Sequence, residues 1–272
     1  MEPLSRAEGI ESRGGYQSYL ADSSAPLAGL YFTLPLFIVY HVGLWWLNTF
    51  AGLRWANAVD IAIGDVLGRF GLAGPLLSFM LVIIVFILTQ TLSGKPARRP
   101  PPHTWLLMIL ESLILSLPVF LLSRLALKLG DYIRPAFLST LEGGESGLSW
   151  AASLILSCGA GVYEEFFFRL LLMGAIILFM NKVLRLKGGW SNFLAACIQA
   201  VLFAASHHLP GGPEEVADWS GAWNVLPAFA FRTAAGLYFA FVYLERGFGI
   251  AAGSHAGYDL LVVALDLLMP LD

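Results

Sequence analysis

Long apolar runs limit the folds open to this sequence more than any other feature. A helix needs about 20 mostly apolar residues to cross the hydrocarbon core of a bilayer. Seven runs come close to that length or exceed it, namely residues 27–50, 71–94, 104–127, 148–180, 190–206, 222–244 and 248–269. The fourth run is longer than one crossing needs, so it accommodates one long tilted helix or a crossing with an interfacial piece. We therefore predict seven or eight membrane spans.

Composition and the continuity of these runs together indicate the type of membrane protein. Charged residues make up 13% of the 272 residues, whereas soluble domains carry about 25%. Only helices and closed barrels satisfy every backbone polar group in lipid, and barrel strands alternate in polarity over about ten residues. The uninterrupted runs predict an all-α, polytopic transmembrane helical bundle. Weak amphipathic character in residues 55–70 predicts an interfacial segment outside the first two spans.

Charge and cysteine content argue against other classes of protein. The net charge of −3 offers no basic excess for a nucleic-acid partner. Cys158 and Cys197 both lie in apolar runs, which is neither a disulfide framework nor a zinc ribbon. We interpret both thiols as small core residues, because free cysteine packs as a hydrophobe.

The ends of the spans indicate the domain organisation and the orientation. Residues 1–24 are polar and lack the pattern of a signal peptide, so we expect a loose tail before a single transmembrane domain at 25–272. Two loops are basic and a later one is acidic; their charged residues are Lys95, Arg98 and Arg99, then Lys182, Arg185 and Lys187, and lastly Glu214, Glu215 and Asp218. The positive-inside rule places both basic loops in the cytoplasm. Seven spans then put the N-terminus inside and the acidic loop outside.

Ionisable residues inside the predicted spans require an explanation, since a charge at the bilayer centre costs about 2.5–3.5 kcal/mol on insertion scales. Most of them gather in the C-terminal half, where they are Glu164, Glu165, Arg169, His207, His208, His255, Asp259 and Asp266. Elsewhere, we interpret His41 as a satisfied packing residue. Glu111 either faces the site or has a buried structural partner, and Arg124 and Arg232 either snorkel or pair.

Helical spacing divides the two adjacent glutamates. Glu165 and Arg169 stand four residues apart and share a face, so they can pair. Glu164 points about 100° away around the helix. One carboxylate is then held while its neighbour is free for chemistry, although a buried salt bridge that fixes helix packing explains the same spacing.

Two further pairs follow the same spacing in later spans. His255 and Asp259 share a face, and a carboxylate there can take the imidazole N–H and fix its tautomer. Phe203 and His207 are related in the same way. A single histidine in a membrane often makes only a helix–helix hydrogen bond. Two histidines with a free glutamate form a set suited to general acid–base chemistry.

The same residues resemble a known family of membrane proteins. Glu164-Glu165-Phe-Phe-Phe-Arg169 fits EExxxR, Phe203-Ala-Ala-Ser-His207 fits FxxxH, and His255-Ala-Gly-Tyr-Asp259 fits HxxxD/N. In that order they look like the CPBP family, which comprises type II CAAX prenyl endopeptidases and bacteriocin-processing and immunity proteins. The resemblance covers a catalytic core at about 159–261.

The resemblance implies an intramembrane glutamic endopeptidase that needs no metal or other cofactor. Glu164 would activate water together with His207, His255 and Asp259 would position the carbonyl and stabilise the oxyanion, and Glu165 and Arg169 would support the site. The substrate would be a membrane-associated protein or peptide precursor, and the location would be a bilayer, the bacterial cytoplasmic (inner) membrane.

Three features depart from the family pattern or strain it. The prenyl endopeptidases carry Asn where this chain has Asp259, and an ionised Asp cannot donate a hydrogen bond to an oxyanion. His208 adjoins His207, and spacing alone does not say which of them faces the site. The predicted spans place His207 and His255 at different depths, and we expect the span after Lys187 to begin later than residue 190.

Other classes remain alternatives. A non-catalytic scaffold, regulator or immunity protein on the same fold would keep these residues for packing. A proton-coupled transporter would use the acids as a relay, but we find no symmetric halves. An aspartyl protease would use Tyr258-Asp259, although its second Gly-x-Gly-Asp motif is missing. HExxH, the zinc protease motif, and a serine protease GxSxG are both absent.

Overall fold

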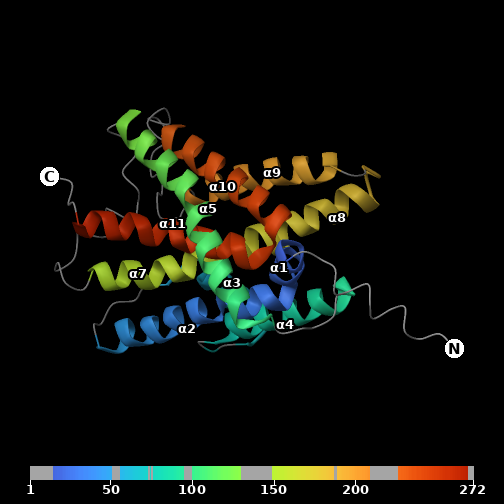
Figure 1. Ribbon diagram of the computed structural model, residues 1–272. Coiled ribbons are helices and arrows are strands. Elements are labelled where there is room, and N and C mark those ends of the chain that lie inside the picture. The colour runs from blue at the N-terminus through green and yellow to red at the C-terminus, as the bar shows by residue number, and fades with distance from the viewer. Residues whose placement is uncertain are drawn as a thin grey trace.

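The protein is a bundle of helices. The computed structural model describes residues 15–50, 56–72, 74, 76–94, 100–129, 149–186, 189–208 and 226–268. Within these residues every regular element is helical and no strand occurs. The predicted all-α transmembrane bundle is therefore confirmed. Figure 1 shows several long helices roughly side by side, with others crossing them obliquely.

Each of the predicted apolar runs contains a helix. Outside the fourth run, the helices of these runs are α2 (Pro26–Phe50), α4 (Leu77–Ser93), α5 (Pro102–Leu129), α9 (Gly189–His208), α10 (Leu226–Arg246) and α11 (Phe248–Leu268). In the part of the chain that the structure describes, five of these helices are long and apolar enough to cross a membrane. The remaining one, α4, has 17 residues and is shorter than the other five.

The fourth and longest run forms one continuous helical rod. Its parts follow each other directly as α7 (Ser149–Gly159), η1 (Ala160–Glu164), η2 (Phe166–Met173) and α8 (Gly174–Lys182), with Glu165 helical between the two η segments. This is the single long helix that the sequence left as one of two options. The η segments are π-helix, a wider turn that often occurs at functional sites.

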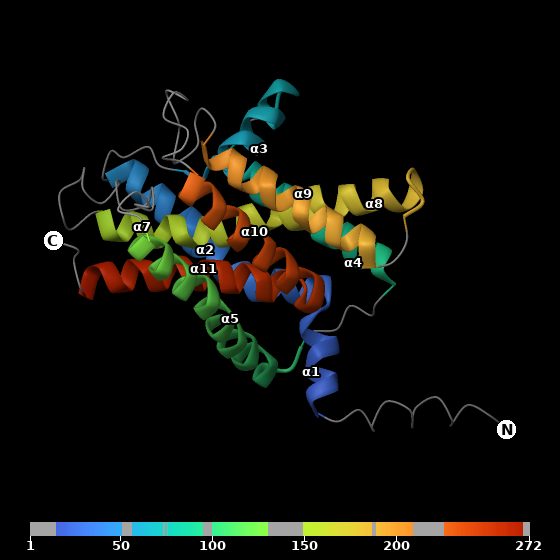
Figure 2. The same ribbon diagram turned by 90° about the horizontal axis from the view of Figure 1, so that it is seen from above.

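Helix α11 lies at the centre of the bundle. It packs against α2, α5, α7, α10 and η1, and Figure 2 shows it between α5 and the α2–α7 pair. A bilayer supplies little hydrophobic drive between helices, so close packing depends on small residues. A Cβ placed on Gly161 of η1 would lie 2.7 Å from the backbone nitrogen of Ala256 in α11. Glycine at this position therefore allows the rod and α11 to touch.

Two short helices lie outside the spans. The predicted interfacial segment is α3 (Ala58–Arg69), of which Ile63 is the buried residue. The expected loose tail is in part wrong, because α1 (Gly15–Ser23) forms within it; residues 1–14 lie outside the described part.

Tyr19 of α1 donates to Glu111 of α5, which also pairs with Arg246 of α10. Glu111 thus has structural partners, the second of its two predicted options.

The orientation inferred from loop charge stays a prediction. Lys95, Arg98, Arg99, Lys187 and the acidic loop at 209–225 lie outside the described residues. Figures 1 and 2 both place the C-terminal ends of α4 and α8 at the same end of the bundle. Both basic loops begin at these helix ends, which is the arrangement that the positive-inside rule requires.

Candidate active site

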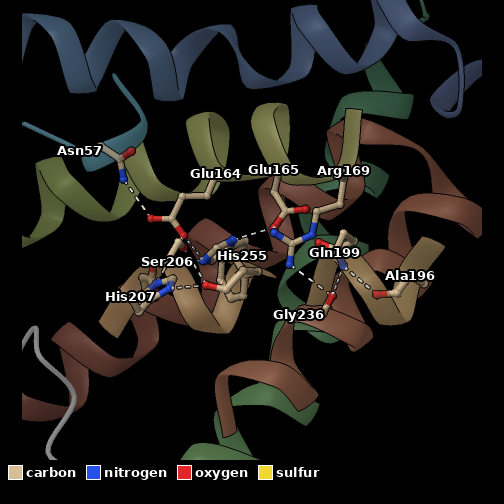
Figure 3. Close-up of polar contacts among 12 residues, drawn as sticks. Asn57, Glu164, Glu165, Arg169, Ala196, Gln199, Ser206, His207, Gly236 and His255 are labelled. Atoms are coloured by element: carbon tan, nitrogen blue, oxygen red, sulfur yellow. Dashed lines mark hydrogen bonds and ion pairs between the residues drawn. The ribbon is translucent and has the colours of Figure 1, made fainter. Parts of the chain in front are cut away.

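Glu165 and Arg169 form a buried ion pair on the helical rod. Arg169 Nη1 lies 3.1 Å from Glu165 Oε1, and both side chains are fully buried. Arg169 Nη2 also donates to the backbone oxygen of Gly236 in α10, at 3.3 Å. The predicted pairing is therefore present, and it also ties the rod to α10 (Figure 3).

Neighbouring groups hold the guanidinium in place. Its carbon lies 4.6 Å from the centre of the Phe203 ring, a cation–π contact. Gln199 Nε2 donates to the same Gly236 oxygen at 3.1 Å. These contacts join the rod to α9 and α10 around the guanidinium. Removing one partner of the buried ion pair would leave an uncompensated charge at this junction.

Glu165 also orients His255. His255 Nδ1 lies 2.7 Å from Glu165 Oε1, and a carboxylate paired with arginine acts as an acceptor, so Nδ1 carries the proton. The predicted shared face of His255 and Asp259 is present, but the N–H predicted for Asp259 goes to Glu165 instead. Asp259 Oδ2 lies 3.8 Å from the other nitrogen, Nε2, beyond hydrogen-bond distance. Phe239 stacks on the imidazole, with ring centres 4.7 Å apart.

The backbone of α9 fixes the tautomer of His207. His207 Nδ1 lies 2.8 Å from the carbonyl oxygen of Phe203, one helical turn earlier. A carbonyl only accepts hydrogen bonds, so Nδ1 donates and the neutral ring keeps its lone pair on Nε2. Phe203 also stands edge-on to this imidazole. The FxxxH spacing is thus explained by helix geometry.

Glu164 faces both imidazoles with one oxygen. Its Oε2 lies 4.0 Å from His207 Nε2 and 3.9 Å from His255 Nε2. Its Oε1 accepts a hydrogen bond from Asn57 Nδ2 at 3.0 Å. Its side chain is 14% exposed, in contrast to the fully buried Glu165. Polar atoms about 4 Å apart are suited to a bridging water.

The depth difference between the two histidines is overcome by an offset between helices. His207 lies in the last turn of α9, whereas His255 lies well inside α11. The expectation that this span begins later than residue 190 is wrong, since α9 begins at Gly189. Of the adjacent histidines, His207 approaches Glu164, while His208 stacks on Phe229.

Several polar residues outside this cluster have other roles. His41 Nε2 lies 2.8 Å from the hydroxyl of Tyr163, which confirms its interpretation as a satisfied packing residue. Arg232 interacts electrostatically with Asp259, and Arg124 with Asp266. Cys158 is buried and Cys197 is partly buried, and both thiols are free.

Asn57 is the residue of this cluster that the sequence reasoning missed. It precedes an amphipathic segment, a place typical of a helix N-cap, which predicts the start of α3. Its contact with Glu164 joins residues 107 positions apart, and no local pattern carries that information. Among the described side chains, no three or more His, Cys, Asp or Glu residues are arranged to hold a metal ion.

Comparison with known proteins finds one family model that matches this chain. Residues 146–261 match the family model of type II CAAX prenyl endopeptidases, Rce1-like. The resemblance to the CPBP family is therefore confirmed over this region, which contains the rod and helices α9 to α11. No curated protein and no solved structure matches the chain.

Proposed function

We propose that this protein is an intramembrane endopeptidase that hydrolyses a peptide bond of a membrane-associated protein or peptide precursor. The observation that carries the proposal is the convergence of two imidazole Nε2 atoms on one oxygen of Glu164, at 4.0 and 3.9 Å. These side chains come from three separate helices in a bundle with apolar surroundings. The Rce1-like family match supports the same class of activity.

In the proposed reaction, Glu164 and His207 activate the attacking water. A water between Glu164 Oε2 and His207 Nε2 can be polarised by both acceptors. As its oxygen attacks the substrate carbonyl carbon, one proton passes to this pair. When the C–N bond breaks, the same proton passes to the leaving amine, so the catalytic groups return to their starting state.

His255 is suited to stabilise the oxyanion. When protonated, its Nε2–H can donate to the carbonyl oxygen as negative charge develops there. Glu165 would hold the ring and balance the imidazolium charge through Nδ1, 2.7 Å away, as the carboxylate does in a serine protease triad. Asp259 Oδ2 is 3.8 Å from Nε2, so in its protonated form it would add a second donor.

The substrate class is a further part of the proposal. CAAX cleavage requires a prenylated protein, whereas leader peptides, precursor peptides and membrane anchors require only a segment that enters the bilayer. We propose a precursor of this second kind, and we propose the bacterial cytoplasmic membrane as the location.

Glu164→Gln tests this proposal. We expect membranes of cells with wild-type protein to contain new protein termini that are absent with Glu164→Gln, while the uncleaved precursors accumulate. Glu111→Gln is the matched control, because Glu111 is also a glutamate inside a span but pairs with Arg246 away from the site. If Glu164→Gln gives the wild-type set of termini, the protein acts as a scaffold or regulator instead.

A further inference from the structure

We propose that Asn57 is a positioning residue for Glu164, and that it makes the orientation of this carboxylate depend on the docking of helix α3. The inference rests on the proposed function, because it assigns Glu164 the reacting oxygen. Asn57 lies outside the region that matches the family model, which begins at residue 146. Its contact with Glu164 therefore extends the site into the N-terminal part of the chain.

The orientation of the Asn57 amide is fixed by helix α3. Asn57 is the N-cap of α3, and its Oδ1 accepts a hydrogen bond from the backbone nitrogen of Val59 at 2.9 Å. Because the oxygen is used in this way, the amide NH₂ group must point to the other side. There Nδ2 donates to Glu164 Oε1 at 3.0 Å (Figure 3). A flipped amide would lose both hydrogen bonds.

Tyr40 of α2 holds the first turn of α3 in this position. Its hydroxyl accepts a hydrogen bond from the backbone nitrogen of Asn57 at 2.8 Å and donates to Asp60 Oδ2 at 2.9 Å. Tyr40 is fully buried and Asn57 is 9% exposed. The side chain that reaches Glu164 is thus anchored at its own backbone and at Asp60 in the first turn of its helix.

The hydrogen bond from Asn57 to Glu164 Oε1 determines the direction in which Glu164 Oε2 points. The terminal torsion of a glutamate is broad, so a carboxylate with no donor on Oε1 would be free to rotate. The Asn57 amide holds Oε1, which leaves Oε2 directed at His207 and His255. The N-terminal end of α3 also carries partial positive charge, which favours a negative carboxylate beside it.

Two substitutions separate this role from helix capping. Asp and Ser cap helices about as well as Asn, so Asn57→Asp and Asn57→Ser both keep the cap of α3. Neither variant can donate from an amide: Asp places a second carboxylate beside Glu164, and the Ser hydroxyl is too short to reach it. Tyr40→Phe is the converse variant, which loosens α3 and keeps the amide.

The assay uses substrates that the cell itself supplies. Membranes from Glu164→Gln cells, which contain the accumulated precursors, are solubilised and mixed with purified wild-type or variant protein from pH 5 to pH 9. Mass spectrometry follows the formation of the termini that wild type produces. Thermal unfolding of each variant is measured in the same detergent.

We expect both Asn57 variants to unfold close to the wild-type temperature and to cleave about 10- to 100-fold more slowly, as for a misplaced catalytic group. The acid limb of the Asn57→Asp rate profile should move to higher pH, because a second carboxylate disfavours ionised Glu164. The Asn57→Ser profile should keep its wild-type limbs. Tyr40→Phe should lower the unfolding temperature and slow cleavage less.

The inference and the proposed function fail in different ways. If both Asn57 variants cleave at the wild-type rate with the wild-type pH profile while Glu164→Gln is inactive, Asn57 only caps α3. If Tyr40→Phe abolishes cleavage and the Asn57 variants do not slow it, docking of α3 matters without the amide, which also overturns the inference. If Glu164→Gln itself cleaves normally, the proposed function is wrong.

Discussion

At the scale of single residues, Glu165 has two partners that make different demands on it. It balances the fully buried charge of Arg169 and it holds His255 through Nδ1. The first contact contributes to stability and the second to the proposed chemistry. A single substitution removes both at once, so it cannot tell these roles apart.

Glu165→Gln combined with Arg169→Met separates them. Glu165→Gln alone leaves the arginine unpaired, and we expect it to lower stability by about 3–5 kcal/mol. The double variant replaces the pair by neutral groups of similar size, so it should regain much of that stability. Cleavage should remain low in both variants, because His255 lacks a carboxylate on Nδ1. Unfolding in detergent and cleavage of the accumulated precursors measure the two effects. Recovery of cleavage together with stability would mean that Glu165 is purely structural.

The sequence predicted the pairing of Glu165 with Arg169, but it did not predict the contact of Glu165 with His255. The four-residue spacing of Glu165 and Arg169 predicts a shared face, and the structure has the ion pair. The same rule directed Asp259 to the N–H of His255, where Glu165 is found instead. Spacing within a helix says which side chains can meet, whereas contacts between helices depend on packing. The contact between Asn57 and Glu164 is of this second kind.

At the scale of helices, the position of Glu164 depends on how closely η1 approaches α11. A Cβ on Gly161 would lie 2.5 Å from Ala256 Cβ and 2.9 Å from the backbone oxygen of Ala252. Two of the three nearest atoms belong to the backbone of α11, which cannot turn aside as a side chain can. Glu164 follows three residues later and His255 adjoins Ala256, so this contact sets the distance between them.

Gly161→Ala should therefore push the rod away from α11. We expect a loss of about 1–3 kcal/mol in stability, as for an overpacked core, with slower cleavage because Glu164 moves away from His255. Gly174→Ala is the control on the same rod, since a Cβ there meets nothing within 4 Å and alanine in a helix is favoured over glycine by about 0.5–1 kcal/mol. Unfolding temperature and cleavage rate should both separate the two variants; equal behaviour would contradict the close contact.

At the scale of the whole molecule, the apolar runs predicted the helices well because hydrophobic length is a local property. Their arrangement was less accessible to sequence reasoning. The predicted spans put His207 and His255 at different depths in the bilayer. In the structure α9 and α11 are offset, so both histidines lie close to Glu164. The length of the fourth run left its number of crossings open, and the continuous rod from Ser149 to Lys182 now favours one.

A single crossing by this rod fixes the sides of three loops relative to each other. Between the end of α4 and the end of α8 the chain would cross twice, through α5 and the rod, and α9 would then cross once more. In a background with Cys158→Ala and Cys197→Ala, we expect Ser93→Cys and Asn181→Cys to react with an impermeant maleimide only after cells are permeabilised. Ser220→Cys should react in intact cells. All three changes keep every charged residue, so they leave the positive-inside signal intact. Labelling of Ser93→Cys and Asn181→Cys from opposite sides would mean that the rod does not cross once, and Glu164 would then lie at a different depth from the one proposed.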